Sequence, residues 1–272
     1  DVCSSDLLLV VHIKDEKYAF NVDNIIEIIN RSELTDIPES ESYLAGIMHH
    51  RDEVLPILNF RSMINLTSYE NEQINMLDLV KEQHVAWIKE FRECIQNDTP
   101  FTKALDPHAC GLGKWIDGMM DCLKCNNEGF VNLIKTHIYD EHTSLHLDGK
   151  MILELSDKEE KIRLTETIIV EHYNKVIAGL NLLKENLFKL ISAYERVIVY
   201  SYKGHKFGLI IDYFDKIVTI DDREIQHLST GSLATNDLVS FNSVVHISNS
   251  VIMIVDFKDP ILEASMSESE VD

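Results

Sequence analysis

The sequence predicts an α+β protein in which a helical insert divides a β-rich region into two parts. In residues 7–66 and again in residues 195–262, apolar and β-branched residues form short runs separated by polar turns, which is typical of β-strands. In residues 67–194, apolar residues instead recur every third or fourth position, as they do on one face of an α-helix. We therefore predict a first β-rich part, an inserted helical domain and a second β-rich part, and we expect the acidic residues 263–272 to form a disordered tail.

Composition limits the functions that this chain can have. Its 46 acidic residues against 25 lysines and arginines give a formal net charge of −21. This charge repels phosphate backbones, so we expect no nucleic-acid binding. No apolar run is long enough to span a bilayer, so we expect no membrane insertion. The five cysteines are an odd number and no secretion signal precedes them, which favours a cytoplasmic protein with free or metal-bound thiols.

The two β-rich parts are expected to contain strands joined by turns, and one short helix. Asp23 or Asn24 can cap that helix, because short polar side chains accept hydrogen bonds from the first backbone N–H groups. Isoleucines follow at positions 25, 26, 28 and 29. The predicted strands are residues 7–13, 18–22, 44–50 and 54–58 in the first part, and residues 197–202, 207–211, 239–247 and 251–257 in the second.

The insert is expected to fold as a four-helix bundle, because four of its stretches have a helical period. One apolar stripe runs from Ile162 to Tyr194 and would return the chain to the β-rich region, and another helix is marked by residues 130–145. Trp87 and Trp115 are expected in the core. The histidines at positions 137 and 172 lie on apolar faces, which predicts a place in the core or beside a bound metal. The first stripe comprises Ile74, Leu77, Val80, His84, Trp87, Phe91 and Ile95.

Four residues of the insert are candidate metal ligands: His84, Cys110, His142 and His146. His84 points inward with the first apolar stripe, and the other two histidines share one helix face because they are four positions apart. Cys110 precedes a Gly-Leu-Gly sequence and can lie at a helix start, where a thiolate is favoured. One thiolate and three neutral imidazoles would complete the tetrahedral shell that zinc prefers. His108, beside Cys110, is not needed for this shell.

Other interpretations of these residues stay open at the level of sequence. His84 could be a core histidine with a hydrogen-bond partner, the other two histidines a solvated helix face, and Cys110 an inert buried thiol. Cys122 and Cys125 could form a rival zinc or redox site, but a single Cys-x-x-Cys is a weak signal without a second pair. We identify no nucleophile–base pair and no paired carboxylates, so we expect no enzyme.

The two β-rich parts carry short motifs in a familiar order. They are Tyr-Ala-Phe-Asn-Val at residues 18–22, Leu-Ala-Gly-Ile at 44–47, Val-Leu-Pro-Ile-Leu-Asn-Phe-Arg at 54–61, Phe-Gly-Leu-Ile-Ile-Asp at 207–212 and Ile-Met-Ile-Val-Asp-Phe at 252–257. Together they resemble the CheW-like family, the coupling module of bacterial chemotaxis. The resemblance implies a split CheW-like domain of two SH3-like β-barrels packed on each other.

The insert carries a second set of motifs. His84 is followed by a tryptophan three positions on, Cys-Gly-Leu-Gly-Lys-Trp occupies residues 110–115, and His142 and His146 follow in order. These motifs resemble the CZB family, the chemoreceptor zinc-binding module. The resemblance implies that Zn²⁺ is the cofactor and that the three histidines and Cys110 hold it.

The CheW-like resemblance also implies the partners, a CheA-type histidine kinase and chemoreceptors, with docking around Ile47, Arg51 and Leu55. The family usually has an Asn-Leu-Arg-Gly turn here, whereas this chain has His-His-Arg-Asp at residues 49–52. Asp52 replaces the glycine, and aspartate is the costlier occupant if this position requires a positive φ.

The leading functional prediction is a chemotaxis scaffold that couples chemoreceptors to the kinase, with zinc in the insert modulating the coupling. The alternative is a cytoplasmic oxidant sensor that works through the zinc-bound Cys110 thiolate. A metal-dependent hydrolase is less favoured, because a catalytic zinc needs an open coordination position. A purely structural zinc is the fourth interpretation, and the sequence does not predict an oligomeric state.

Overall fold

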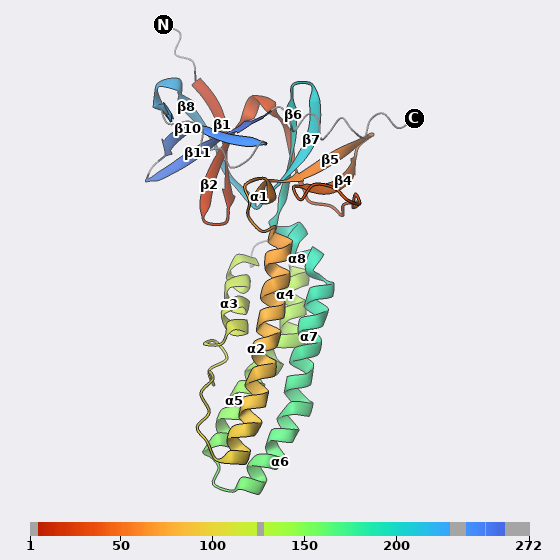
Figure 1. Cartoon of the computed structure of the whole chain (residues 1–272), viewed down its shortest axis with the longest axis vertical. Coiled ribbons are helices and arrows are strands. Elements are labelled where there is room, and N and C mark those ends of the chain that lie inside the picture. The colour runs from red at the N-terminus through yellow and green to blue at the C-terminus, as the bar shows by residue number, and fades with distance from the viewer. Residues whose placement is uncertain (1–4, 124–127, 229–237, 248, 259–272) are drawn as a thin grey trace. The chain divides into compact units, whose positions relative to one another are not determined.

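The computed structural model describes residues 5–123, 128–228, 238–247 and 249–258, so the predicted tail at residues 263–272 lies outside the described residues. The chain divides into two compact units (Figure 1). The β unit is formed by Asp1–Tyr69 with Ile191–Asp272, and the helical insert is formed by Glu70–Leu190.

The β unit contains two sheets, and each sheet takes strands from both sides of the insert. The first sheet has the order β8-β1-β2-β11-β10-β9 and the second has the order β3-β6-β7-β5-β4. Parallel pairing of β2 with β11 and of β5 with β7 joins the two parts of the chain. The interrupted β-rich region is therefore one folded unit. Its strands are β1 (Ser5–Ile13), β2 (Glu16–Asn21), β3 (Ile25–Asn30), β4 (Leu44–His50), β5 (Glu53–Asn59), β6 (Arg196–Tyr202), β7 (His205–Ile211), β8 (Tyr213–Asp221), β9 (Ile225–His227), β10 (Val239–Ile247) and β11 (Ser250–Phe257).

The largest apolar cluster of the β unit contains buried residues of both sheets. Phe20 of the first sheet and Phe207 of the second are both fully buried in it, together with Phe60 of the short helix α1 (Phe60–Met63). Two smaller clusters each lie within one sheet, one around Val10 and one around Ile57. Because buried apolar surface is the main source of stability, these clusters hold the two parts together. The prediction of a β-rich host with a helical insert is confirmed.

The predicted short helix at residues 25–29 is wrong, because these isoleucines form strand β3. β-branched side chains have restricted rotamers in a helix and pack well in a sheet, and Ile28 pairs with Ile198 of β6. A single 3₁₀ turn, η1 (Val22–Asn24), precedes the strand, and Asn21 caps it by accepting the Asp23 N–H at 2.8 Å. A second 3₁₀ turn, η4 (Asp222–Glu224), lies between β8 and β9. The sequence predicted neither this turn nor the two strands beside it.

Two buried ion pairs of the β unit lie close in sequence to the points where the chain leaves for the insert and returns. Arg61 donates to both carboxylate oxygens of Asp212, with Nε–Oδ1 at 2.7 Å and Nη2–Oδ2 at 2.6 Å. The Lys14 N–H adds a third hydrogen bond to Asp212 at 2.8 Å. Glu195, just after the insert, pairs with Arg31. Buried charges require such partners, because desolvation of an unpaired ion costs several kcal/mol.

The helical insert consists of four helical segments, two of which contain a π-helical turn. One segment is α4-η2-α5 and another is α6-η3-α7, followed by α8. No helix in the described ranges is both long and apolar enough to cross a membrane. The elements are α2 (Tyr69–Asn97), α3 (Gly111–Leu123), α4 (Glu128–Ile134), η2 (Lys135–Tyr139), α5 (Asp140–Glu154), α6 (Lys158–Ile168), η3 (Ile169–Tyr173), α7 (Asn174–Glu185) and α8 (Leu187–Tyr194).

The predicted apolar stripe of α2 lies largely in the core, since all its members from Leu77 onward are buried, and so are Trp87 and Trp115. Two other core predictions are wrong. Ile162 is 41% exposed. Helix α6 buries Thr165 and Ile168, and Ile162 lies outside the face that these two residues form. His137 is exposed as well, next to the buried Ile138 of η2.

Candidate metal centre

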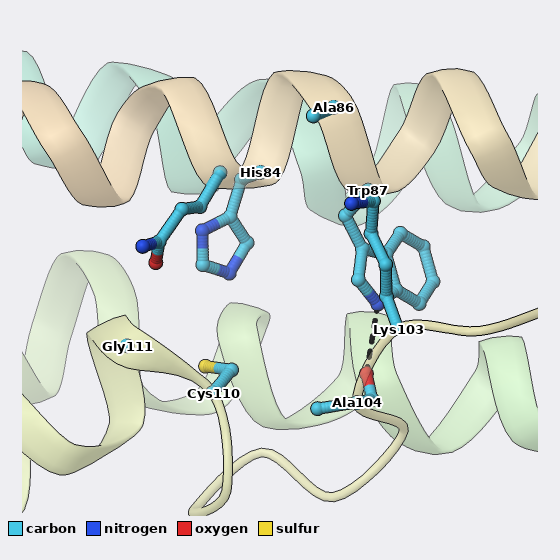
Figure 2. Close-up of a pocket in the computed structure, with 8 residues that line it drawn as sticks. His84, Ala86, Trp87, Lys103, Ala104, Cys110 and Gly111 are labelled. Atoms are coloured by element: carbon cyan, nitrogen blue, oxygen red, sulfur yellow. Dashed lines mark hydrogen bonds between the residues drawn. The ribbon is translucent and has the colours of Figure 1, made fainter.

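The structure brings the four predicted ligand residues together from three elements of the insert. His84 comes from the middle of α2, Cys110 directly precedes α3, and His142 and His146 lie on one face of α5. One ligand atom from each residue can be chosen so that all of them lie within 4.8 Å of one another. In the close-up, His84 and Cys110 face each other between the helix and the loop (Figure 2).

Hydrogen bonds fix which ring nitrogen faces the cluster. His84 Nδ1 lies 2.7 Å from the Val80 carbonyl oxygen, and His146 Nδ1 lies 3.1 Å from the Ala104 carbonyl oxygen. A carbonyl oxygen can only accept, so both Nδ1 atoms carry the proton and both Nε2 atoms carry a lone pair. Both Nε2 atoms are buried and have no hydrogen-bond partner among the described residues. A buried polar atom without a hydrogen bond costs free energy, and a bound metal ion would remove this cost at both nitrogens.

The three imidazoles are neutral. Burial lowers the pKa of His142 to about 2, with smaller effects of the neighbouring His146 and His84. Burial also lowers the pKa of His146 to about 4, and it lowers the pKa of His84. A neutral imidazole offers its lone pair to a metal, so the protonation state suits ligation.

Cys110 completes the cluster at the start of α3. Its Sγ lies 3.1 Å from His142 Nε2, and it accepts the Gly113 N–H at 3.3 Å. Burial raises the pKa of the Cys110 thiol, while the backbone N–H groups of Gly113 and Leu112 oppose this rise only in part. The helix start alone therefore does not produce the thiolate that the sequence led us to expect. A coordinated cation would do so, because a coordinating thiol is deprotonated.

Gly113 explains the Gly-Leu-Gly sequence after the cysteine. A Cβ at this position would lie 1.8 Å from the Pro107 carbonyl oxygen. Only glycine allows the loop that leads to Cys110 to lie this close to the first turn of α3.

One backbone group of the site could not be predicted from the sequence. The Ala104 carbonyl oxygen accepts the Trp87 Nε1–H at 2.8 Å as well as the His146 Nδ1–H. Trp87 in turn stacks on Phe91 with ring centroids 4.9 Å apart. The loop before Cys110 thus orients His146, which is the usual task of a group around a metal ligand.

The remaining candidates lie outside the four-residue cluster. His172 Nδ1 lies 2.7 Å from Glu141 Oε2 and its Nε2 lies 3.2 Å from Asp148 Oδ2. The exposed His108 pairs with Asp117 at 2.9 Å. The side chains of Cys122 and Cys125 lie outside the described residues.

A pocket of about 300 Å³ adjoins the cluster and is lined by Cys110, His84 and Trp87 among others (Figure 2). Cys110 is only half-buried, whereas the three histidines are buried. Cys110 and His84 are the two members of the cluster that line this pocket.

The predicted docking residues lie on the β4–β5 hairpin of the β unit. Arg51 is 71% exposed and its Nη2 lies 2.9 Å from Glu27 Oε2. Ile47 is half-buried, and Leu55 is only 2% exposed in the apolar cluster of its sheet. Leu55 and Arg51 both line a depression of about 210 Å³. The left-handed residue of the turn is Arg51 with φ 56°, so Asp52 does not occupy the strained position considered above.

Comparisons with known proteins match parts of this chain to CheW proteins. A model of the CheW-like domain family matches residues 7–88. A chemotaxis protein CheW of Helicobacter pylori is 35% identical over 122 residues, which cover 41% of this chain and 74% of that protein. The chemotaxis proteins CheW of Thermotoga maritima and Bacillus subtilis are each 24% identical, over 78 and 90 residues. These alignments cover 29% and 32% of this chain and only 51% and 58% of the two relatives.

A solved structure, the scaffolding protein TtCheW of Thermoanaerobacter tengcongensis, aligns with a TM-score of 0.44 and 10% identity. The alignment covers 94% of this chain and 91% of that chain.

Proposed function

Because this chain belongs to the family of CheW-like proteins, we propose that it is a chemotaxis scaffold that couples chemoreceptors to a CheA-type histidine kinase. The names of the matched relatives support a role in chemotaxis. The chain spans little more than half the length of two of these relatives, so its partners are part of the proposal. We place the docking surface at Arg51, Ile47 and the depression floored by Leu55.

We propose further that the insert is a CZB-type module that binds one zinc ion through His84, Cys110, His142 and His146. The observation that carries this proposal is the pair of buried, unpaired Nε2 atoms beside a thiol and a third imidazole. Three imidazoles and one thiolate suit zinc in number and in softness. A bound zinc ion would supply a Lewis-acidic centre that keeps Cys110 ionised.

Zinc would modulate coupling through the ends of the insert. The three ligand-bearing elements are separate in sequence, so shared ligation ties α2, α5 and the start of α3 together. The chain enters the insert at Glu70 and leaves it at Leu190, and both ends continue into the β unit. A change in the bundle therefore acts on the β unit at two points of the chain.

A hydrolase is disfavoured. Four protein ligands fill the tetrahedral shell of a zinc ion and leave no open coordination position for a catalytic water molecule.

Metal analysis tests the zinc site directly. We expect one zinc per chain in the wild type and its loss in Cys110→Ala. The matched control is Cys94→Ala, because Cys94 is a buried cysteine of the same insert whose thiol donates to the Phe91 carbonyl. Equal zinc content in all three proteins would refute the ligand assignment.

Kinase binding tests the scaffold and its modulation separately. We expect the chain to retain a CheA-type kinase in a pull-down, and we expect a chelator to change the amount retained. Retention that does not respond to the chelator would refute zinc modulation alone. If the chain retains the kinase neither with nor without the chelator, the coupling role is refuted.

The half-buried position of Cys110 in the lining of the pocket favours a second candidate, an oxidant sensor. Hydrogen peroxide that reaches Cys110 would transfer one oxygen to the thiolate and leave as water, and the resulting sulfenate would be a weaker ligand for zinc. Mass spectrometry after mild peroxide treatment tests this candidate. We expect Cys110 to be oxidised before the buried Cys94, and the reverse order would exclude it.

A further inference from the structure

We propose that the pocket beside Cys110 binds a small neutral aromatic molecule that carries one O–H or N–H donor. This inference goes beyond the proposed zinc site and rests on it for the identity and the strength of the hydrogen-bond acceptor. The ligand would lie between α2 and the loop that precedes Cys110 (Figure 2).

The size of the pocket limits the ligand to one or two rings. Its volume is about 300 Å³, at the lower end of the range for ligand pockets, and a cavity of roughly 150 Å³ is enough for benzene. Ala86 on the helix and Ala104 on the facing loop both line the pocket. Their short side chains keep this space open.

Trp87 gives the pocket a rigid apolar wall. It is 3% exposed and stacks on Phe91. Its N–H is already bonded to the Ala104 carbonyl oxygen, so the small part of the ring that lines the pocket offers apolar contact only. An aromatic ligand can meet this ring edge-to-face, which adds to the gain from burial. Little side-chain freedom is lost on binding, since the Trp87 ring is already held.

We assign the specific polar contact to the sulfur of Cys110, although Gln83 also lines the pocket. Cys110 is a half-buried lining residue, and its Sγ accepts one N–H from Gly113. A metal-bound thiolate retains lone pairs and accepts stronger hydrogen bonds than a neutral thiol. The imidazole nitrogens would be occupied by the metal, so a ligand donor would find its acceptor at Sγ.

Charge favours a neutral ligand over an anion. The chain has a net charge of −21, which disfavours approach of anions. Lys103, the cation among the lining residues, has its Nζ 3.5 Å from Glu90 Oε2. An aromatic anion is therefore an alternative that the test below distinguishes.

Calorimetric titration of the full chain with three probes tests the proposal. Phenol has the ring and the donor, anisole has the ring without the donor, and benzoate has the ring with a negative charge. With zinc-loaded protein we expect phenol to bind at least about 10-fold more tightly than either other probe, equivalent to about 1.4 kcal/mol. Equal binding of phenol and anisole would refute the donor contact, and tighter binding of benzoate would refute the neutral ligand.

Variants locate the site. Ala86→Leu adds volume at an exposed position of α2 that lines the pocket, and we expect it to weaken phenol binding at least 10-fold, on the order of the effect of filling a small cavity. Ala104→Leu adds volume from the opposite wall and should do the same. Val85→Leu is the control, because Val85 is an exposed neighbour on the same helix that is not part of the lining. Unchanged phenol affinity in both alanine variants would overturn the proposal.

Zinc content measured on each sample separates this inference from the proposed metal site. Loss of phenol binding with zinc retained would be a failure of the pocket alone. A wild-type chain that holds no zinc but still binds phenol in a way that Ala86→Leu abolishes would refute the metal site and leave the pocket intact. In the cobalt-loaded chain, phenol but not anisole should shift the thiolate-to-cobalt absorption band, and an unshifted band would refute contact with Sγ.

Discussion

The β unit and the helical insert differ in how their buried ionisable side chains are paired. In the β unit, the buried carboxylates of Asp212 and Glu195 are each met by an arginine. In the insert, the buried Nε2 atoms of His84 and His146 have no hydrogen-bond partner among the described residues and lie near the Cys110 thiol. The chain itself therefore supplies the counter-ions of these two carboxylates, whereas an added ligand would complete the histidine and cysteine cluster of the insert. The stability that a bound metal adds should accordingly be largest in the insert.

Removal of zinc should give the largest difference between the two units. If zinc is present at ten-thousand-fold its Kd, its removal lowers the free energy of unfolding of the insert by roughly 5 kcal/mol. Hydrogen–deuterium exchange resolves the units separately. We expect faster exchange in α2 and α5 after chelation and unchanged exchange in β1 and β7. Equal acceleration of exchange in both units would show that zinc stabilises the β unit as much as the insert.

Arg61→Met should destabilise the β unit by about 3–5 kcal/mol, because it leaves the Asp212 carboxylate buried without its counter-ion. The matched control is Arg92→Met, which removes an exposed arginine paired with Glu166 and should cost less than about 1 kcal/mol. Urea unfolding of both variants measures these costs. We expect the same cost with and without zinc, and a cost that appears only in the zinc-free chain would show that the units are not independent.

Glu195 should make the β unit sensitive to pH. Burial raises the pKa of Glu195 from 4.5 to about 7, although Arg31 lowers it in part. A carboxyl group with a higher pKa in the folded chain stabilises the fold at low pH, and this contribution is lost as the pH rises from 4.5 to 7. The wild type should therefore lose up to about 3 kcal/mol relative to Glu195→Gln across this window.

Urea unfolding of the wild type and Glu195→Gln at pH 4.5, 6 and 8 checks this expectation. Glu166→Gln, at an exposed glutamate that also pairs with an arginine, is the matched control. A constant offset between Glu195→Gln and the wild type would show that pairing with Arg31 holds the Glu195 carboxylate ionised throughout.

Two glycine substitutions should show whether the insert is closely packed away from the histidine and cysteine cluster. A Cβ on Gly179 would lie 2.6 Å from the His137 carbonyl oxygen, whereas a Cβ on Gly118 would meet nothing within 4 Å. Gly179→Ala should cost about 1–3 kcal/mol, and Gly118→Ala should stabilise by about 0.5–1 kcal/mol because alanine is the better helix former. Thermal unfolding of the metal-free chain measures both. Equal effects would mean that the metal-free insert lacks defined helix packing.

The sequence predicted those elements that a helical period or an apolar run marks. The stripe of α2 follows from the 3.6-residue period of a helix, and the predicted strands follow from short runs of apolar and β-branched residues between polar turns. Strand β8 escaped because its first five residues are exposed on both faces, so no alternation marks it. Strand β3 was mistaken for a helix because consecutive isoleucines fit either period.

The ligand residues could be chosen from the sequence because their types and spacing suit a metal, but their surroundings could not. The acceptor for His146 is a backbone carbonyl, which leaves no trace in the choice of side chain at Ala104. Likewise, the burial of Leu55 depends on the cluster formed with Val199, a residue on the far side of the insert in sequence.

The π-helical turns have a consequence for how this insert can be aligned with relatives. In an α-helix each residue advances by about 100°, and a π turn accommodates one extra residue without interrupting the helix. The turn η2 ends at Tyr139 and α5, which carries His142 and His146, begins at the next residue. A relative that lacks one residue within η2 would keep these histidines four positions apart and yet direct them toward a different neighbour. Transfer of the site between sequences therefore requires a match in the length of residues 135–139 as well as a match of the histidines.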